Sequence, residues 1–212
     1  MSYYTEKQYS NPLPSNAIND LKIFFFESFL KDSKKILDIG CSVGRIMGLY
    51  PEKFEGIDIE KDALDIARKK GLKVKYANVI DKLSFKDNSF DAVYCSQIIE
   101  HLDEPLHLVL EVKRILKKGG KAVFITPDYL ISSNAKINNF WDDYTHKTPF
   151  TRQSLIKISK DANLKKFRSY HLPGLFFRHL IRFGLLSKEN WIKINNKWFV
   201  TKSHDIVLEI IK

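Results

Sequence analysis

The segment Ile36-Leu37-Asp38-Ile39-Gly40-Cys41-Ser42-Val43-Gly44 constrains the fold of this chain more than any other. Its apolar start predicts a buried strand, and the small residues that follow predict a tight turn into a helix. A second apolar strand ends in another acid at Gly56-Ile57-Asp58-Ile59. Two strands arranged in this way predict a pocket for a nucleotide-type ligand. The turn lets the backbone approach the ligand, and the second carboxylate can accept ribose hydroxyls.

The glycine spacing of this turn separates two classes of ligand. A dinucleotide site favours G-x-G-x-x-G, whereas Gly40 is followed here by Ser42, Gly44 and Gly48. The pattern D-x-G-x-S-x-G resembles the first motif of the class I S-adenosylmethionine-dependent methyltransferases, which usually have glycine where Ser42 stands. We therefore expect Ser42 to avoid a backbone conformation that only glycine can adopt. A plain strand-to-helix turn is the alternative reading of this motif alone.

Further motifs extend the resemblance over roughly residues 35–127. A helix over 59–71 has acids at its start and bases at its end, and Gly71 is placed to end it. The pair Glu100-His101 follows the fourth apolar strand, as it often does in this family. The next helix is expected to run to Lys118, before Gly119-Gly120 interrupts it. Several motifs in the family's order are more specific than a single turn.

The resemblance implies a pocket for S-adenosylmethionine at the carboxyl ends of the strands. Asp38 would lie by the methionine part, and Asp58 would hold the ribose hydroxyls, unless it is a solvated loop acid. Asn78 stands where the family usually has an aspartate facing the adenine amino group, and its amide oxygen can accept the same hydrogen bond. The residues implied in binding the cofactor are Asp38, Gly40, Cys41, Ser42, Gly44, Asp58, Ile59, Asn78, Val79, Ser96 and Gln97.

The alternation of apolar strands and helices predicts an α/β fold, a three-layer α/β/α Rossmann-like sandwich around a mostly parallel sheet. An amphipathic helix is expected over 15–30, and Thr151 is expected to cap a later helix that stops at Asn163. The resemblance implies that the seventh strand is antiparallel and lies between the fifth and the sixth. The seven strands are expected near 35–39, 54–58, 73–77, 90–95, 121–126, 165–170 and 205–211.

Length and composition favour one domain over residues 1–212. We expect a helical cap over 1–33, a cofactor-binding core over 34–130 and a substrate-side half over 131–212. The two cysteines, Cys41 and Cys95, fall on or beside core strands, so we expect buried thiols in a reducing compartment. The start of the chain lacks the pattern of a signal peptide, which places the protein in the cytoplasm.

The loop Phe140-Trp141-Asp142-Asp143-Tyr144-Thr145-His146 follows the fifth strand, on the side where an acceptor would enter. It resembles a loop in those family members that modify glycans, lipids or other small metabolites. A packed loop with Trp141 in the core is the alternative. The candidates for a general base are His146, His101, Asp143 and Asp142. No metal site is predicted, because the spacing of these residues fits no strong ligand pattern.

Positive charge gathers in the second half of the chain, where residues 131–212 hold 15 Lys and Arg against six Asp and Glu. An insert over about 172–200 combines Arg178, His179 and Arg182 with many aromatic residues. Three interpretations of it remain open: a lid over the acceptor site, a peripheral contact with an anionic membrane through 175–199, and a site for RNA. RNA is the least favoured, because no separate RNA-binding module is visible.

Together these features favour transfer of a methyl group from S-adenosylmethionine to a small, sugar-linked or lipid-linked acceptor, on oxygen or nitrogen. An RNA methyltransferase is the first alternative. An NAD-dependent oxidoreductase on the same kind of sheet is a second, although the dinucleotide glycine pattern is missing. A catalytically silent cofactor-binding subunit is a third. The sequence carries no indication of the oligomeric state.

Overall fold

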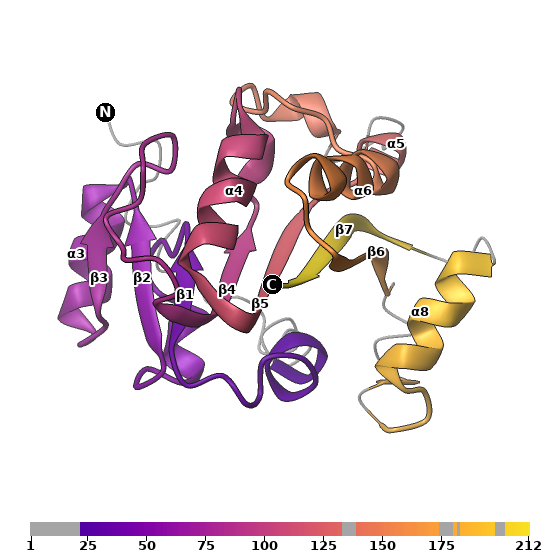
Figure 1. Cartoon of the computed structure of the whole chain (residues 1–212), viewed down its shortest axis with the longest axis horizontal. Coiled ribbons are helices and arrows are strands. Elements are labelled where there is room, and N and C mark those ends of the chain that lie inside the picture. Colours follow the sequence, from indigo (N-terminus) through magenta and orange to yellow (C-terminus); the bar gives the residue numbers. More distant parts are fainter. Residues whose placement is uncertain (1–21, 133–138, 174–179, 182, 198–201) are drawn as a thin grey trace.

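A seven-stranded sheet forms the centre of the protein, and helices cover both of its faces (Figure 1). The computed structural model describes residues 22–132, 139–173, 180–181, 183–197 and 202–212. The strands are β1 (Ile36–Ile39), β2 (Phe54–Asp58), β3 (Val74–Tyr76), β4 (Phe90–Ser96), β5 (Leu116–Pro127), β6 (Lys166–Pro173) and β7 (Lys202–Ile211). They lie in the order β3-β2-β1-β4-β5-β7-β6.

The pairing of the strands confirms the predicted topology. β1 to β5 pair in parallel, whereas β7 pairs antiparallel with both β5 and β6. The chain builds the sheet outward from β1 through β2 to β3, and then returns to β4 on the other side of β1. The strand order therefore reverses between β1 and β4, and in sheets of this kind ligands bind at such a reversal, beyond the carboxyl ends of the strands.

Helices form the two outer layers, which confirms the expected three-layer sandwich. On one face, α4 (Pro105–Ile115) and α6 (Arg152–Asp161) pack on the sheet, together with η3 (Ile99–His101). On the other face lie η1 (Lys22–Glu27), α3 (Lys61–Lys69) and α8 (Lys188–Lys197), with η2 (Met47–Leu49). Two further short elements are α5 (Tyr129–Ser132) and η4 (Phe140–Asp142). No helix in the described ranges is long and apolar enough to cross a bilayer.

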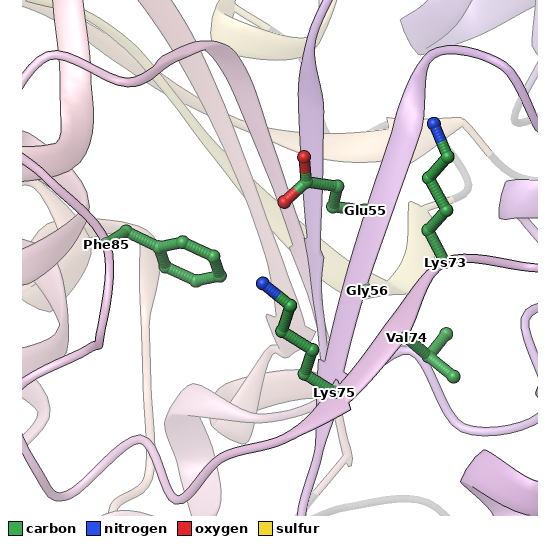
Figure 2. A pocket seen from close by; sticks show the side chains of 6 residues that line it. All are labelled: Glu55, Gly56, Lys73, Val74, Lys75 and Phe85. Carbon is green, nitrogen blue, oxygen red and sulfur yellow. The ribbon is translucent and has the colours of Figure 1, made fainter.

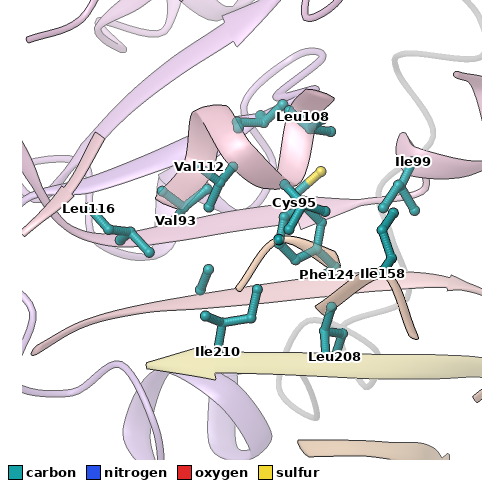
Figure 3. Close-up of a cluster of buried hydrophobic side chains, with 14 of the residues drawn as sticks. Val93, Cys95, Ile99, Leu108, Val112, Leu116, Phe124, Ile158, Leu208 and Ile210 are labelled. Atoms are coloured by element: carbon teal, nitrogen blue, oxygen red, sulfur yellow. The ribbon is translucent and has the colours of Figure 1, made fainter. Parts of the chain in front are cut away.

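The strands alternate their side chains between the two layers, as the pleat requires. In β4, Val93 and Cys95 point to the core beneath α4, which Figure 3 shows, while Ala92 and Tyr94 point to the opposite core. Both cysteines of the chain are buried free thiols, which agrees with the expectation from their positions. Buried on both faces, the central strands are apolar along most of their length.

Several helix ends match the sequence prediction. Gly71 and Asn163 adopt positive φ angles of 77° and 51°, the left-handed conformation expected of helix stops. The Thr151 side chain accepts a hydrogen bond from the backbone N–H of Ser154 and so caps α6. Residues 15–21 of the predicted first helix lie outside the described residues, and the part that follows is a π-helix, η1.

The prediction that the fourth helix runs to Lys118 was wrong. This helix, α4, ends at Ile115, and β5 already begins at Leu116. Gly119, with a φ of 77°, bends the strand instead of breaking a helix. The register of β5 against β4 shifts at this point, which marks a bulge. The backbone N–H of Gly119 donates to the carbonyl of Lys212 at 2.8 Å, so this start of β5 is held by the end of β7.

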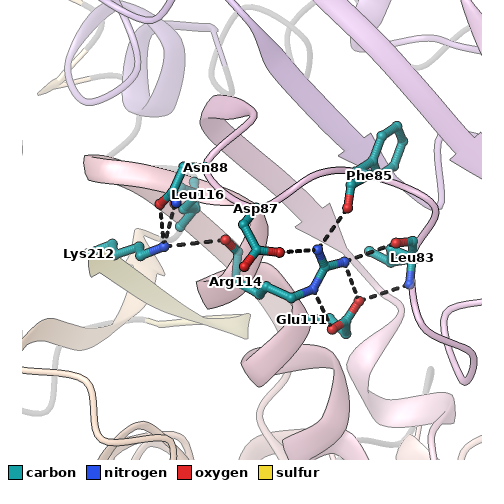
Figure 4. Close-up of polar contacts among 8 residues, drawn as sticks. All are labelled: Leu83, Phe85, Asp87, Asn88, Glu111, Arg114, Leu116 and Lys212. Carbon is teal, nitrogen blue, oxygen red and sulfur yellow. Dashed lines mark hydrogen bonds and ion pairs between the residues drawn. The ribbon is translucent and has the colours of Figure 1, made fainter.

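Arg114, at the end of α4, fastens the loop that leads into β4 (Figure 4). Its guanidinium donates twice to Glu111, at 2.8 Å each, and once to Asp87 at 2.8 Å. The remaining bonds go to the carbonyls of Phe85 and Leu83, at 2.7 and 2.9 Å. These hydrogen bonds lower the pKa of Glu111, which stays paired with Arg114. One side chain thereby ties the loop to the helix.

The described part of the basic aromatic insert packs onto the sheet through α8. Trp191 is fully buried, and its indole N–H donates to the carbonyl of His171 at 3.1 Å. Lys188 and Tyr170 both donate to Glu209 Oε1 at 2.6 Å. Other residues on which the lid, membrane and RNA interpretations rest lie outside the described residues: Arg178, His179, Arg182, Trp198 and Phe199.

Candidate functional site

The turn after β1 lies at the carboxyl end of the sheet, close to the loop after β4 and to the end of β2. Gly40 has a φ of 75°, and a Cβ atom there would lie 2.2 Å from Ile98 Cδ1. A larger residue would require the Ile98 side chain to move, and the left-handed φ favours glycine on backbone grounds. The backbone N–H groups of Gly40 and Cys41 donate to the carbonyl of Ile57, which joins the turn to the end of β2.

Asp58 lies across the same turn and holds it with both carboxylate oxygens. The backbone N–H of Ser42 donates to Oδ2 at 2.7 Å, and that of Glu60 donates to Oδ1 at 2.9 Å. Ser42 has a φ of 48°, so it does adopt the left-handed region, which non-glycine residues enter at a modest cost. Each oxygen of Asp58 keeps a further lone pair. The side chain can thus accept ligand hydroxyls while it fixes the turn.

Asp38 provides a second carboxylate beside Asp58. It is 4% exposed, and burial together with the nearby Asp58 charge raises its pKa to about 8. The Asp58 charge opposes ionisation of Asp38, so a ligand that brings a positive charge would favour the ionised form of Asp38. The electrostatics of this end of the sheet therefore suit a cationic ligand.

The other predicted cofactor residues lie around this pair at the strand ends. The amide oxygen of Asn78, after β3, accepts a hydrogen bond from the backbone N–H of Ile80 at 3.2 Å. Val79 packs at the margin of the core, and Ser96 ends β4. The Gln97 backbone has a φ of 57°, and its side-chain amide donates to Asp205 at 3.2 Å. Cys41 is buried, and Ile59 is exposed.

A second group of polar residues lies on the loop side of β4 and β5. His101, at the end of η3, and His146 face each other with ring centroids 4.8 Å apart. Burial lowers the pKa of His101, and the adjacent His146 adds to that shift. Partial burial opposes ionisation of Asp143, but hydrogen bonds from Thr145 outweigh it and lower its pKa. The structure thus brings together three of the predicted catalytic residues, His101, Asp143 and His146, whereas Asp142 caps η4 through the Asn139 backbone.

Glu100 completes this group, although it was not among the residues predicted for the site. Its side chain is fully buried next to both histidines, and burial raises its pKa to about 8. Thr126 Oγ1 donates to Glu100 Oε2 at 3.0 Å. A Glu-His pair next to a strand end was visible in the sequence. Glu100 lies close to His146, however, only because the loop after η4, which follows β5 in the chain, packs against η3.

Aromatic side chains surround the second group. Phe140 is buried and lies 4.4 Å from the His146 ring, centroid to centroid. Trp141 is 51% exposed and Tyr144 is 80% exposed. The interpretation that places Trp141 in the core was therefore wrong, because Phe140 takes the buried position of this loop. The exposed rings leave an apolar surface next to the histidines.

A cavity of about 250 Å³ lies elsewhere, along β2 and β3 (Figure 2). Figure 2 shows the Lys75 side chain reaching toward the Phe85 ring, and the ammonium lies 5.8 Å from the ring centroid. None of the predicted site residues contributes to its wall, so this cavity is separate from the strand-end residues around Asp38 and Asp58. Its lining residues are Glu55, Gly56, Lys73, Val74, Lys75 and Phe85.

Sequence comparisons link this arrangement to known proteins. The sequence profile of a family described as a methyltransferase domain matches residues 37–124. An uncharacterised protein of Methanocaldococcus jannaschii is 30% identical over 126 residues, which cover 59% of this chain and 58% of the relative. A ubiquinone biosynthesis O-methyltransferase of Alkalilimnicola ehrlichii is 32% identical over 124 residues, or 53% of this chain and 50% of the relative. The chain thus spans little more than half the length of these curated relatives.

Solved structures share the fold over most of the chain. A SAM-dependent methyltransferase from Archaeoglobus fulgidus superposes with a TM-score of 0.70 at 22% identity, covering 93% of this chain and 95% of the other. Phosphoethanolamine N-methyltransferase 2 of Haemonchus contortus, in complex with S-adenosyl-L-methionine, gives a TM-score of 0.72 at 16% identity. That match covers 99% of this chain and 57% of the other. At these identities the likeness concerns the fold.

Proposed function

We propose that this chain is a class I S-adenosylmethionine-dependent methyltransferase that transfers a methyl group to a small acceptor, and its match to a methyltransferase-domain family over residues 37–124 supports the proposal. One observation carries the proposal: the Asp58 carboxylate spans the β1 turn and keeps lone pairs for the ribose hydroxyls. The crevice that Asp58 shares with the buried Asp38 also suits the positive charge of a sulfonium.

The remaining residues of the crevice take the roles that the resemblance implies. Asn78 accepts a hydrogen bond from the adenine amino group, and Val79 packs against the ring. The methionine part would rest against the turn at Gly40, beside the Ile98 side chain. Ser96 and Gln97 lie by the sulfonium end. The bound cofactor supplies an activated methyl group, so the protein needs mainly to align donor and acceptor, an effect that reaches about 7–11 kcal/mol.

We assign acceptor binding to the second group of polar residues. His101, Asp143 and His146 lie on the loop side of the sheet, next to the exposed Trp141 and Tyr144. Such a surface suits a polar acceptor with an apolar part, and we propose a small, sugar-linked or lipid-linked molecule methylated on oxygen or nitrogen. In this proposal the histidines orient the acceptor and remove its proton, a contribution of about 10²–10⁴ in rate.

Contact with a membrane would give the enzyme access to a lipid-linked acceptor. Phe183 and Leu185 flank Gly184 in the turn before α8, and they are 71% and 74% exposed. Two adjacent, exposed apolar side chains in the basic half of the chain fit peripheral binding to an anionic lipid surface. We include such binding in the proposed function.

Two measurements test the proposal. Calorimetric titration with S-adenosylhomocysteine should give saturable binding, and titration with NAD should give none. Binding of NAD alone would support the oxidoreductase instead. Incubation with a labelled methyl donor and separate lipid, metabolite and RNA fractions should label the lipid or metabolite fraction. Label in RNA only would favour the RNA methyltransferase, and binding without any labelled product would favour a catalytically silent subunit.

A further inference from the structure

Three side chains with metal-binding atoms meet although the chain separates them widely. Glu100 and His101 belong to η3, whereas His146 comes from the loop after η4. Each offers one ligand atom, and these three atoms all lie within 4.8 Å of one another. The sequence spacing does not reveal the group, because the two segments are brought together only by the fold.

The Glu100 carboxylate has one oxygen without a partner. Oε2 accepts the hydrogen bond from Thr126, but Oε1 is buried and has no hydrogen-bond partner in the part of the chain that the structure describes. Leaving a buried acceptor unsatisfied costs about 1–3 kcal/mol, and more for a charged group. Nearly all buried polar atoms of native proteins are satisfied, so an atom of this kind indicates a missing partner. Next to two imidazoles, a cation is the partner that fits.

Both histidine rings are held by their Nδ1 atoms. His146 Nδ1 lies 2.6 Å from the carbonyl oxygen of Phe140, so it donates to that carbonyl. His101 Nδ1 lies 2.9 Å from Thr145 Oγ1 and 3.2 Å from the Thr145 carbonyl, and Thr145 Oγ1 donates to Asp143 at 2.6 Å. A metal-binding histidine almost always donates its second ring N–H in this way, which orients the lone pair of the other nitrogen. Both histidines therefore already make the Nδ1 hydrogen bonds that are typical of metal ligands.

The backbone also fixes the two segments against each other. The N–H groups of Lys147 and Thr148 donate to the Glu100 carbonyl at 2.8 and 2.9 Å. Thr148 Oγ1 donates to the Leu102 carbonyl at 2.7 Å. These bonds join the residues directly after His146 to Glu100 in η3 and to Leu102 after it. The three ligand side chains thus project from a rigid frame.

We propose that Glu100, His101 and His146 bind one divalent transition-metal ion. Two imidazoles and one carboxylate form a donor set typical of zinc and of non-haem iron sites with open coordination positions. Tetrahedral zinc with bonds of about 2.0–2.2 Å holds its ligand atoms about 3.3–3.6 Å apart, so the atoms of this cluster must approach one another by up to about 1.5 Å when the ion binds. Rotation of the side chains can supply such a movement.

The metal site follows from the side-chain geometry alone, whereas its role in catalysis rests on the proposed function. An ion held by three protein ligands keeps positions for the oxygen of an acceptor and lowers the pKa of that hydroxyl. With both imidazoles bound to the ion, the histidines would position the acceptor through it, and the proton of the acceptor hydroxyl would leave to solvent. An oxygen acceptor would be favoured over an uncharged nitrogen, because only the hydroxyl needs this activation.

Direct metal binding tests the proposal without any measurement of methyl transfer. The full chain is treated with a chelator, dialysed and titrated calorimetrically with zinc chloride. We expect one equivalent to bind, and cobalt in its place to produce visible absorption bands typical of coordinated Co²⁺. Loss of an outer-shell partner commonly weakens metal affinity by about 10–100-fold, so His146→Ala, which removes a ligand, should weaken it at least as much.

Matched variants show whether zinc binding depends on the side chains of this cluster. His107→Ala removes a histidine on α4 outside the cluster and should leave zinc affinity unchanged. Glu100→Gln preserves the size of the buried side chain and should weaken zinc binding. Absence of stoichiometric binding to the wild-type chain would overturn the proposal, as would equal affinity in wild type and His146→Ala. If a variant does not fold, the wild-type titration and a zinc-dependent rise in its melting temperature decide the question.

Discussion

Replacing Asp58 with asparagine keeps the shape of the side chain but removes its charge and one of its two acceptor oxygens. In the wild type, Oδ2 accepts from Ser42 N–H at 2.7 Å and Oδ1 accepts from Glu60 N–H at 2.9 Å. Asparagine has one oxygen and one NH₂ group, so one of the two backbone donors would face another donor. The turn would lose a contact, and a ribose would lose a charged acceptor.

The magnitude follows from these contacts. A hydrogen bond to a charged group contributes about 1.5–3 kcal/mol, and charge-assisted bonds are about twice as strong as neutral ones. If one ribose hydroxyl loses its acceptor and the other keeps a neutral one, the loss is about 2–4.5 kcal/mol. At 1.4 kcal/mol for each factor of ten, S-adenosylhomocysteine should bind about 30- to 1,600-fold more weakly.

Calorimetric titration at equal protein concentration measures this change, and a melting curve reports the folded fraction of each variant. Asp62→Asn is the matched control, because Asp62 is an exposed acid in the first turn of α3 and the substitution removes the same charge. Affinity within twofold of wild type in Asp58→Asn would refute the reasoning. Equal weakening in Asp62→Asn would show that overall charge, and not the ribose contact, governs binding.

Three further substitutions have defined outcomes. Gly40→Ala should lower the free energy of unfolding by about 2–5 kcal/mol in chemical denaturation, because it combines a left-handed φ with a Cβ 2.2 Å from the Ile98 side chain. Arg114→Met should lower it by about 3–5 kcal/mol, since the buried Glu111 loses its counter-charge. The pKa of Glu111 is depressed in the folded state, so its contribution is present above its ordinary value of 4.5 and is lost at lower pH. The difference between Arg114→Met and wild type should therefore shrink in acid. Changing Phe183 and Leu185 together to serine should weaken flotation with anionic vesicles at least about tenfold, because a buried large apolar side chain contributes about 1.5–3 kcal/mol.

Each of these substitutions has a control at a comparable position. Gly48→Ala should be tolerated, because a Cβ there meets no atom within 4 Å. Arg68→Met removes an arginine from a surface ion pair with Asp65 and should cost less than about 1 kcal/mol. Leu110→Ser removes an exposed apolar side chain from α4 and should not change flotation. Equal effects in a variant and its control would contradict the structural reason given for that variant.

The strands and helix stops were predictable from the sequence because local chemistry determines them. β2 matches its expected range, and Gly71 and Asn163 adopt the left-handed conformation that their residue types favour. The end of α4 was not predictable in this way. Leu116 to Lys118 are compatible with a helix locally, but the pairing of Leu116 with Phe90 and the bond from Gly119 to Lys212 place them in β5. Those partners are distant in the sequence.

In the candidate site, too, some residues were predictable from the local sequence and others depend on contacts between distant segments. Asp38, Gly40 and Asp58 follow strands directly, so their common location could be inferred from the parallel sheet. Ser42 adopts the left-handed region while Asp58 accepts its N–H, a contact between the turn after β1 and the end of β2. Glu100 was missed because an acid after a strand is ordinarily exposed. Only the packing of the loop that carries His146 makes it a buried, unsatisfied group.

The position of β7 between β5 and β6 has a consequence for synthesis on the ribosome. β6 pairs with β7 alone in the sheet, so it has no partner strand until residues 202–211 have emerged. Until then β5 also presents an unpaired edge, and such edges are templates for association with other chains. The nascent protein is thus exposed to misassembly between the emergence of β6 and that of β7, when a chaperone that shields open strands would protect it most.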